Sequence, residues 1–189
     1  ERTVRDQTRE IRHSREEIAL RLIAAQEYRH DESGAHVRRI GMYAEALGKA
    51  LAYPEEHVEL LRLAAPMHDV GKIGIPDAIL LKPAKLTPEE FDVIKTHTTI
   101  GSEILSGSDL PLIDLSRQIA LCHHEKWDGS GYPQGLAGAA IPEAARLVAI
   151  IDVYDALSHD RVYRPAMTED QTLSIIMQGK GKHFNPVML

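Results

Sequence analysis

The sequence has almost no cysteine. Cys122 is the only one in 189 residues, which excludes an internal disulfide framework and predicts a protein of the reducing cytosol; the thiol itself is expected in the core. No apolar run approaches the roughly 18 residues that span a bilayer, and no signal-peptide pattern is present, so we expect no membrane segment and a cytoplasmic location. Excess positive charge is also missing. The net charge of −6 argues against a surface for nucleic-acid polymers, although a small nucleotide remains compatible with it.

Strand periodicity, internal repeats and low-complexity tracts are absent as well. Apolar residues recur with helical spacing along the whole chain. With 43% hydrophobic and 26% charged residues, the composition is that of an ordinary globular domain with a sizeable core. The sequence therefore predicts an all-α fold.

Residues 1–28 are predicted to form one helix, because they are rich in Arg and Glu and contain no Gly or Pro. Val4, Ile11, Ile18 and Ala25 recur with heptad spacing, which is half of a coiled-coil seam, but the other half of the seam is polar. Two interpretations stay open. The helix is either a solvated surface helix or a connector that forms a homodimer and joins an upstream receiver or sensory domain. The start at Glu1 favours a piece of a longer protein.

A histidine and an aspartate, His68 and Asp69, stand side by side at the end of an apolar run. We expect a helix to begin after Pro54 and to end at this pair, with residues 71–77 in a loop. A buried imidazole or carboxylate costs roughly several kcal/mol unless it is hydrogen-bonded, paired or bound to metal. Taken alone, the pair is most simply a hydrogen bond at a helix end.

Other histidines and acids lie in similar positions. His97 lies near the middle of a helix predicted over residues 91–105. His123 and His124 end an apolar helix that passes into a glycine-rich loop. Asp152 follows a nearly uninterrupted apolar stretch, a depth at which a carboxylate needs a cation. Each of these residues alone has a simpler explanation, such as a hydrogen-bonded core histidine.

Glu32 and His36 are four residues apart, so they share one face of a helix, which alone indicates no more than an exposed ion pair. Taken together, however, the candidates form an ordered set of potential metal ligands: Glu32, His36, His68, Asp69, His97, His123, His124 and Asp152. Imidazole and carboxylate ligands without thiolates suit Fe, Mn, Co, Ni or Zn. The set exceeds the needs of one ion, so two or three are expected, and clusters of this kind are suited to cleaving phosphoesters.

The motifs around these residues are similar to those of a known family. They are Asp31-Glu32-Ser33-Gly34-Ala35-His36, residues 68–77, His97, His123-His124-Glu125-Lys126-Trp127-Asp128-Gly129-Ser130-Gly131-Tyr132-Pro133 and residues 152–157. The sequence resembles the HD-GYP domains, the branch of the HD superfamily of metal-dependent phosphohydrolases that hydrolyses cyclic di-GMP. The resemblance implies an HD-domain helical bundle over residues 29–189, preceded by the connector helix of residues 1–28.

The resemblance also implies roles for individual residues. It implies a two-metal core held by His68, Asp69, His97, His123, His124 and Asp152, with Asp69 bridging, and a third ion with Glu32 and His36; iron or manganese is expected. Lys72 would act with Asp69 in catalysis, close to the scissile phosphate. Substrate contacts are implied for Tyr132, Asp155, Arg161 and Arg164, and partner contacts for the loop with Gly129, Gly131, Tyr132 and Pro133.

The expected function is hydrolysis of cyclic di-GMP to pGpG, with GMP as a further product left open, by attack of a metal-bridged hydroxide. An alternative is a regulatory module that binds metal and cyclic di-GMP, turns over slowly and acts through protein contacts. A hydrolase of another nucleotide is disfavoured by the intact GYP element. His30, His159, Val162 and Asn185 depart from the family pattern, which bears on substrate positioning and rate.

Overall fold

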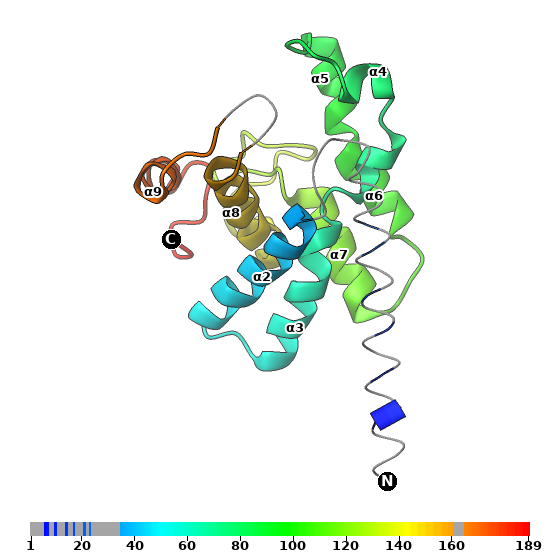
Figure 1. Cartoon of the computed structure of the whole chain (residues 1–189), viewed down its shortest axis with the longest axis vertical. Coiled ribbons are helices and arrows are strands. Elements are labelled where there is room, and N and C mark those ends of the chain that lie inside the picture. The colour runs from blue at the N-terminus through cyan, green and yellow to red at the C-terminus, as the bar shows by residue number, and fades with distance from the viewer. Residues whose placement is uncertain are drawn as a thin grey trace.

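The computed structural model describes residues 6, 7, 10, 14, 17, 21, 23, 35–160 and 165–189. Its central helices are α2 (Ala35–Ala50), α3 (Glu55–Ala64), α7 (Pro111–Cys122) and α8 (Glu143–Ser158), which pack against one another (Figure 1). Within the described ranges there is no strand, and only two isolated bridges occur, Asp128 with Ala137 and Lys180 with Phe184. The prediction of an all-α fold is confirmed.

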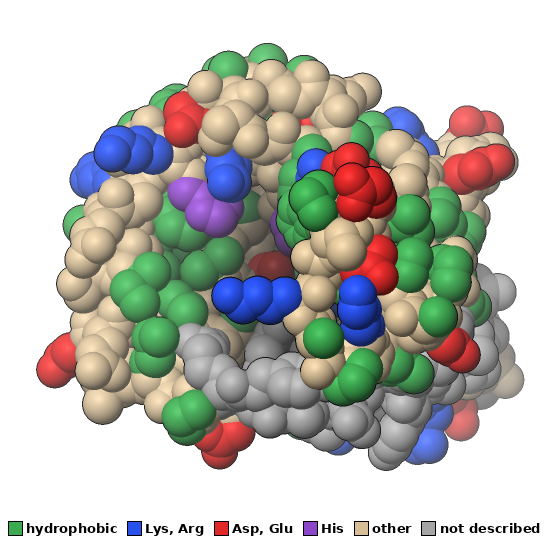
Figure 2. Space-filling model, turned by 90° about the horizontal axis from the view of Figure 1, so that it is seen from above, with side chains coloured by type: hydrophobic (Ala, Val, Ile, Leu, Met, Phe, Trp, Pro, Cys, Tyr) green, Lys and Arg blue, Asp and Glu red, His purple; other side chains and the backbone are tan. Residues whose placement is uncertain are grey.

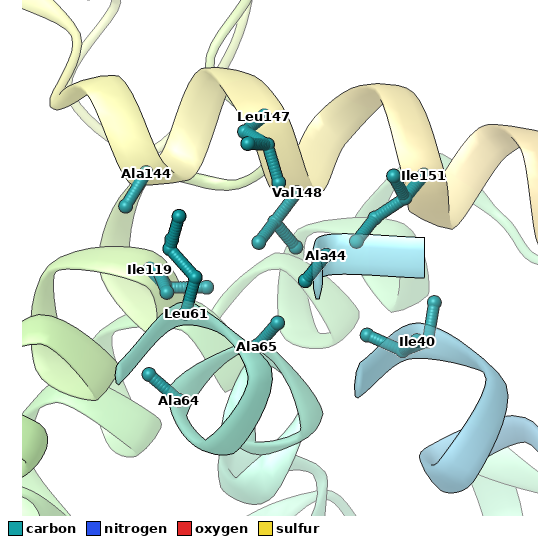
Figure 3. Close-up of a cluster of buried hydrophobic side chains, with 10 residues drawn as sticks. All are labelled: Ile40, Ala44, Leu61, Ala64, Ala65, Ile119, Ala144, Leu147, Val148 and Ile151. Atoms are coloured by element: carbon teal, nitrogen blue, oxygen red, sulfur yellow. The ribbon is translucent and has the colours of Figure 1, made fainter. Parts of the chain in front are cut away.

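One cluster of buried apolar side chains joins these central helices (Figure 3). It contains Ile40, Ala44, Leu61, Ala64, Ala65, Ile119, Ala144, Leu147, Val148 and Ile151. Helix α8 is apolar almost all round because neighbouring elements cover it on several sides. Asp152 lies within this helix, directly after the buried Ile151, and is partly exposed. Cys122 is buried in a smaller cluster with Ile141 and Ala145, as expected.

The end of α3 differs from the prediction. The helix stops at Ala64 and does not reach His68-Asp69. Pro66 lies in a short 3-10 helix, η2 (Ala65–Met67), because proline has no N–H for an α-helical hydrogen bond. A second 3-10 helix, η3 (Val70–Gly74), replaces most of the predicted loop and leads into α4 (Asp77–Leu80).

The single helix predicted over residues 91–105 is also wrong. The chain forms α5 (Pro88–Lys95) and α6 (His97–Ile104), separated at Thr96. The hydroxyl groups of Thr96, Thr98 and Thr99 each donate to the carbonyl three residues earlier, a local alternative that bends helices. As a result His97 begins a helix instead of lying within one. The α4–α5 hairpin protrudes from the bundle (Figure 1), and neither helix contains a buried residue.

Described residues near both ends of the chain pack against the bundle. The described residues of the N-terminal segment are helical, and Ile23 is buried against Val37 and Met67. The proposed seam, with Val4, Ile11, Ile18 and Ala25, lies outside the described residues. Helix α9 (Glu169–Gln178) begins with a capping box of Thr168 and Gln171. After it, Phe184 and Met188 pack against Ile150. Among the described residues, no helix is long and apolar enough to cross a membrane.

Candidate metal centre

The ends of several helices bring the predicted ligands together. His36 lies in the first turn of α2, His97 begins α6 and Asp152 lies on α8, while His68-Asp69 joins the two 3-10 helices and His123-His124 follows α7. Their potential ligand atoms form two groups, each within 4.8 Å of one another: Asp69, His97, His123 and His124 in one, and His36, His68 and Asp152 in the other. Every described member of the predicted ligand set therefore lies in this cluster. Glu32 is outside the described residues.

The histidine rings are held in one orientation by their Nδ1 atoms. His68 Nδ1 lies 3.0 Å from the carbonyl oxygen of Ala65, and His97 Nδ1 lies 2.7 Å from that of Ile94. His123 Nδ1 lies 3.1 Å from the carbonyl oxygens of both Ile119 and Ala120. Because a carbonyl only accepts, Nδ1 carries a proton in each of these rings, and Nε2 is the nitrogen that faces the centre.

His36 is oriented by a carboxylate instead. Its Nδ1 lies 2.6 Å from Oδ2 of Asp155, which is only 2% exposed. Arg39 also donates to both oxygens of Asp155, with 2.9 Å between Nη2 and Oδ2. Burial would raise the pKa of Asp155, but the hydrogen bonds from Arg39 and His36 lower it. The structure thus places Asp155 against His36, one of the predicted ligands, with its oxygens in contact with His36 and Arg39.

Asp69 faces both groups of ligands. Its Oδ1 lies 3.3 Å from His97 Nε2 and 3.8 Å from His123 Nε2, whereas its Oδ2 lies 3.2 Å from His68 Nε2. Lys72 Nζ is 2.6 Å from the same Oδ2. Burial would raise the pKa of Asp69, but the Lys72 ammonium, together with His68, holds it well below its usual range. The carboxylate is therefore charged and lies between the two groups, as a bridging ligand must.

The histidines of the first group are neutral. Burial and the neighbouring His68 lower the pKa of His123 to about 3. Burial and His123 likewise lower the pKa of His124. Only a neutral imidazole offers a lone pair to a metal, so these rings are ready to bind one at physiological pH.

The donor set fits divalent metal ions. His68 Nε2 is buried without a hydrogen bond, 3.2 Å from Asp69 Oδ2 and 3.8 Å from Asp152 Oδ1. Burial lowers its pKa, but the charges of Asp69 and Asp152 outweigh this and raise the pKa to about 9. A divalent cation between these atoms would displace the Nε2 proton, bind the lone pair that it leaves and neutralise the carboxylates in its place.

The centre opens on one side of the molecule. His124 and Asp152 are the partly exposed members of the two groups. Figure 2 shows a hollow in the middle of one face, with acidic and histidine side chains inside it and basic side chains at its edge. Arg161 and Arg164, the predicted substrate contacts, lie outside the described residues.

The loop after His124 covers part of the centre. The Tyr132 ring packs on the ring of His124, with 4.8 Å between centroids. Burial, followed by the charges of Asp69 and Asp152, raises the pKa of Tyr132, so its phenol stays protonated and can donate a hydrogen bond. The backbone of this loop requires glycine at position 131, because a Cβ there would lie 2.3 Å from the backbone nitrogen of Lys126.

Glu125 anchors this loop and was missing from the predicted site residues. The side chain is 2% exposed, and its carboxylate accepts from the backbone nitrogens of Gln134 at 2.7 Å and Leu136 at 3.0 Å. The sequence signal that could have identified Glu125 is its position directly after His123 and His124. Its partners could not be read from the sequence, because they depend on how the loop folds back.

Glu125→Gln is expected to loosen the loop, because one acceptor oxygen becomes an amide NH₂ that faces a backbone N–H. Charged hydrogen bonds of this kind contribute roughly 1.5–3 kcal/mol. Hydrogen exchange of the Gln134 and Leu136 amides should accelerate, while Glu103→Gln, on the surface of α6, should leave it unchanged. Equal protection in wild type and Glu125→Gln would contradict the anchoring role.

Buried histidines and carboxylates that meet at the helix ends of a bundle are typical of a metal-binding α-helical protein. Among known protein families, the family model of the HD domain matches residues 19–188 of this chain. The chain belongs to the HD domain family.

Individual relatives agree with this assignment. A cyclic di-GMP phosphodiesterase of Vibrio cholerae is 46% identical over 193 residues, which cover 95% of this chain and 39% of the relative. The cyclic di-GMP phosphodiesterase response regulator RpfG of Xanthomonas campestris pv. campestris is 46% identical over 177 residues, which cover 94% of this chain and 47% of RpfG. The chain thus spans less than half of the length of these relatives.

Solved structures show the same fold. The crystal structure of a cyclic GMP-AMP specific phosphodiesterase of V. cholerae, V-cGAP3, superposes with a TM-score of 0.67 at 19% sequence identity. The match covers 92% of this chain and 46% of that one. The predicted HD-domain bundle is therefore confirmed.

Proposed function

We propose that this chain is the catalytic domain of a metal-dependent phosphodiesterase that hydrolyses cyclic di-GMP to pGpG, with further hydrolysis to GMP left open. The observation that carries the proposal is the position of Asp69, whose two oxygens face two separate groups of histidine ligands. The relatives named as cyclic di-GMP phosphodiesterases supply the substrate class. A regulatory module with slow or no turnover is less well supported, because the described candidate ligands cluster and Lys72 contacts Asp69 among them.

The centre is proposed to hold two or three iron or manganese ions. His68, Asp69, His97, His123, His124 and Asp152 would hold the two-ion core, and Glu32 with His36 would add a third ion. Such ions supply a nucleophile at neutral pH and neutralise the charge that develops on phosphate. The nitrogen-rich donor set without thiolate supports these metals without selecting between them.

Residues at the opening would handle the phosphodiester itself. Lys72 holds a positive charge beside Asp69 and is partly exposed, so it can stabilise negative charge on phosphate oxygens. Tyr132 would donate a hydrogen bond from its protonated phenol. Arg161 and Arg164 are proposed to bind the phosphates, for which the planar guanidinium offers paired donors. Asp155 is proposed to position His36.

The rest of the protein is proposed from the relatives and the helix at the N-terminus. Residues 1–28 would connect the domain of residues 29–189 to an upstream receiver or sensory domain; the name of the relative RpfG as a response regulator supports this. The helix of residues 1–28 is also proposed to form a homodimer, and the protein is proposed to be cytoplasmic. Partner proteins are proposed to contact the loop that contains Gly129, Gly131, Tyr132 and Pro133.

Turnover tests the proposed function directly. Protein prepared without oxygen and loaded with iron or manganese should convert cyclic di-GMP to pGpG, and deoxynucleotides and alarmones should remain intact. Binding of cyclic di-GMP without turnover by the metal-loaded protein would favour the regulatory module instead.

Lys72→Ala is expected to lower kcat on the order of 100-fold and to change KM much less, because its charge matters most as charge develops on phosphate. Lys82→Ala is the matched control, since that lysine is exposed to a similar extent and pairs with Glu90 on the α4–α5 hairpin. Steady-state kinetics and metal analysis of both variants check the prediction. An unchanged kcat in Lys72→Ala with full metal content would refute the role.

A further inference from the structure

Phe91 offers partly exposed aromatic surface beside the candidate metal centre. It lies on α5 of the protruding hairpin and is 44% exposed. Helix α5 buries no residue, so the ring does not pack into the core and instead contacts Tyr132 and Lys95. The part of the ring that remains in solvent is apolar surface that an aromatic group of a bound molecule can cover.

Phe91 faces the loop over the metal centre. Its ring lies edge to face with Tyr132, with 6.3 Å between centroids and 82° between planes. Tyr132 in turn packs at 4.8 Å on His124, one of the candidate ligands. Phe91 is therefore only two ring contacts from the metal centre. Figure 2 shows hydrophobic side chains along one edge of the hollow, with charged ones beside them.

Lys95 adds a positive charge to this pair. One turn after Phe91, its Nζ lies 5.0 Å from the centroid of the Phe91 ring and 5.8 Å from that of Tyr132. Asp92 holds the ammonium from the same helix at 2.7 Å. The side chain of Lys95 remains 35% exposed, so its other donors can reach a ligand.

We propose that Phe91 and Lys95, together with Tyr132, form a subsite that binds one guanine base of the substrate. The inference rests on the proposed function, and it adds a determinant of base selectivity. Guanine and adenine both stack on an exposed aromatic ring, so stacking alone does not distinguish them. Lys95 would supply the selectivity, because guanine presents two acceptors, O6 and N7, whereas adenine replaces one of them with an amino donor.

The experiment measures binding of non-hydrolysable phosphorothioate analogues of cyclic di-GMP and cyclic di-AMP to the metal-loaded protein by calorimetry. Phe91→Ala is expected to weaken binding of the guanine analogue on the order of tenfold, and Phe91→Trp to retain it. Leu81→Ala is the matched control, because Leu81 is an apolar residue of the same hairpin with 48% exposure. Lys95→Met is expected to reduce the preference for guanine over adenine by about fivefold.

Three results would overturn the subsite. They are an unchanged affinity in Phe91→Ala, an equal loss in Phe91→Ala and Leu81→Ala, and an unchanged base preference in Lys95→Met. Metal content, measured in every variant, shows that the centre is intact. Failure of the wild type to hydrolyse cyclic di-GMP, with tight binding of its analogue, would refute the proposed function while leaving the subsite supported.

Discussion

Replacing Asp69 with alanine is expected to remove most of the bound metal and to abolish phosphodiester hydrolysis. The carboxylate is the only described group whose oxygens face both groups of ligands, at 3.3 Å from His97 Nε2 and 3.2 Å from His68 Nε2. Its loss also leaves Lys72 without the partner that it contacts at 2.6 Å. Removing residues that merely support a ligand costs about 10–100-fold in metal affinity or activity, so removal of a bridging ligand should exceed 100-fold.

Metal quantification and turnover in anaerobically purified protein check this expectation. Asp114→Ala is the matched control, since Asp114 is a surface carboxylate on α7 that pairs with Arg117. Glu32→Ala provides a graded comparison, because loss of a third-site ligand should release about one ion and reduce activity without erasing it. Wild-type metal content and rate in Asp69→Ala would eliminate the proposed centre.

Gly71→Ala is expected to destabilise the fold strongly. A Cβ at this position would lie 1.9 Å from the carbonyl oxygen of His97 and 2.4 Å from the backbone nitrogen of Gly101. Both obstacles are backbone, so η3 and α6 must separate to admit one methyl group. Overpacking of this kind costs about 1–3 kcal/mol or more, and the displaced segments carry Asp69, Lys72 and His97.

Denaturant unfolding of the metal-free protein measures the effect, because bound ions would add their own linkage term to the free energy of unfolding. Gly74→Ala is the matched control: its Cβ would meet only the side chain of Ile100, at 3.0 Å, which can rotate away. Equal free energies of unfolding for Gly71→Ala and the wild type would show that the close approach of η3 to α6 is not required.

The sequence predicted the fold class and the described members of the ligand set because both follow from local patterns. Helical spacing of apolar residues marks the bundle, and polar ligands at the ends of apolar helices must turn inward. His36, His68 and Asp152 each have a simpler explanation alone and are named because the candidates form one set; the structure brings their potential ligand atoms within 4.8 Å of one another. Their use as ligands remains a prediction.

The remaining differences arise from hydrogen bonds that spacing does not reveal. The break at Thr96 depends on several threonine hydroxyls bonding back to the helix. The environment of Asp155 depends on His36, which lies 119 residues away in the sequence. The anchoring role of Glu125 depends on backbone N–H groups of Gln134 and Leu136, which reach it only when the loop has folded. Each of these contacts exists only after the chain has folded, so a reading of local patterns could not supply it.

The α4–α5 hairpin has a consequence for motion. Because neither helix buries a side chain, little free energy opposes local opening of this segment, and its amides should exchange with solvent faster than those of α8. Binding of a ligand that contacts Phe91 would order the hairpin, and the lost conformational entropy would reduce the free energy of binding. The same low local stability would permit rapid release, so the hairpin would govern how long a product stays bound.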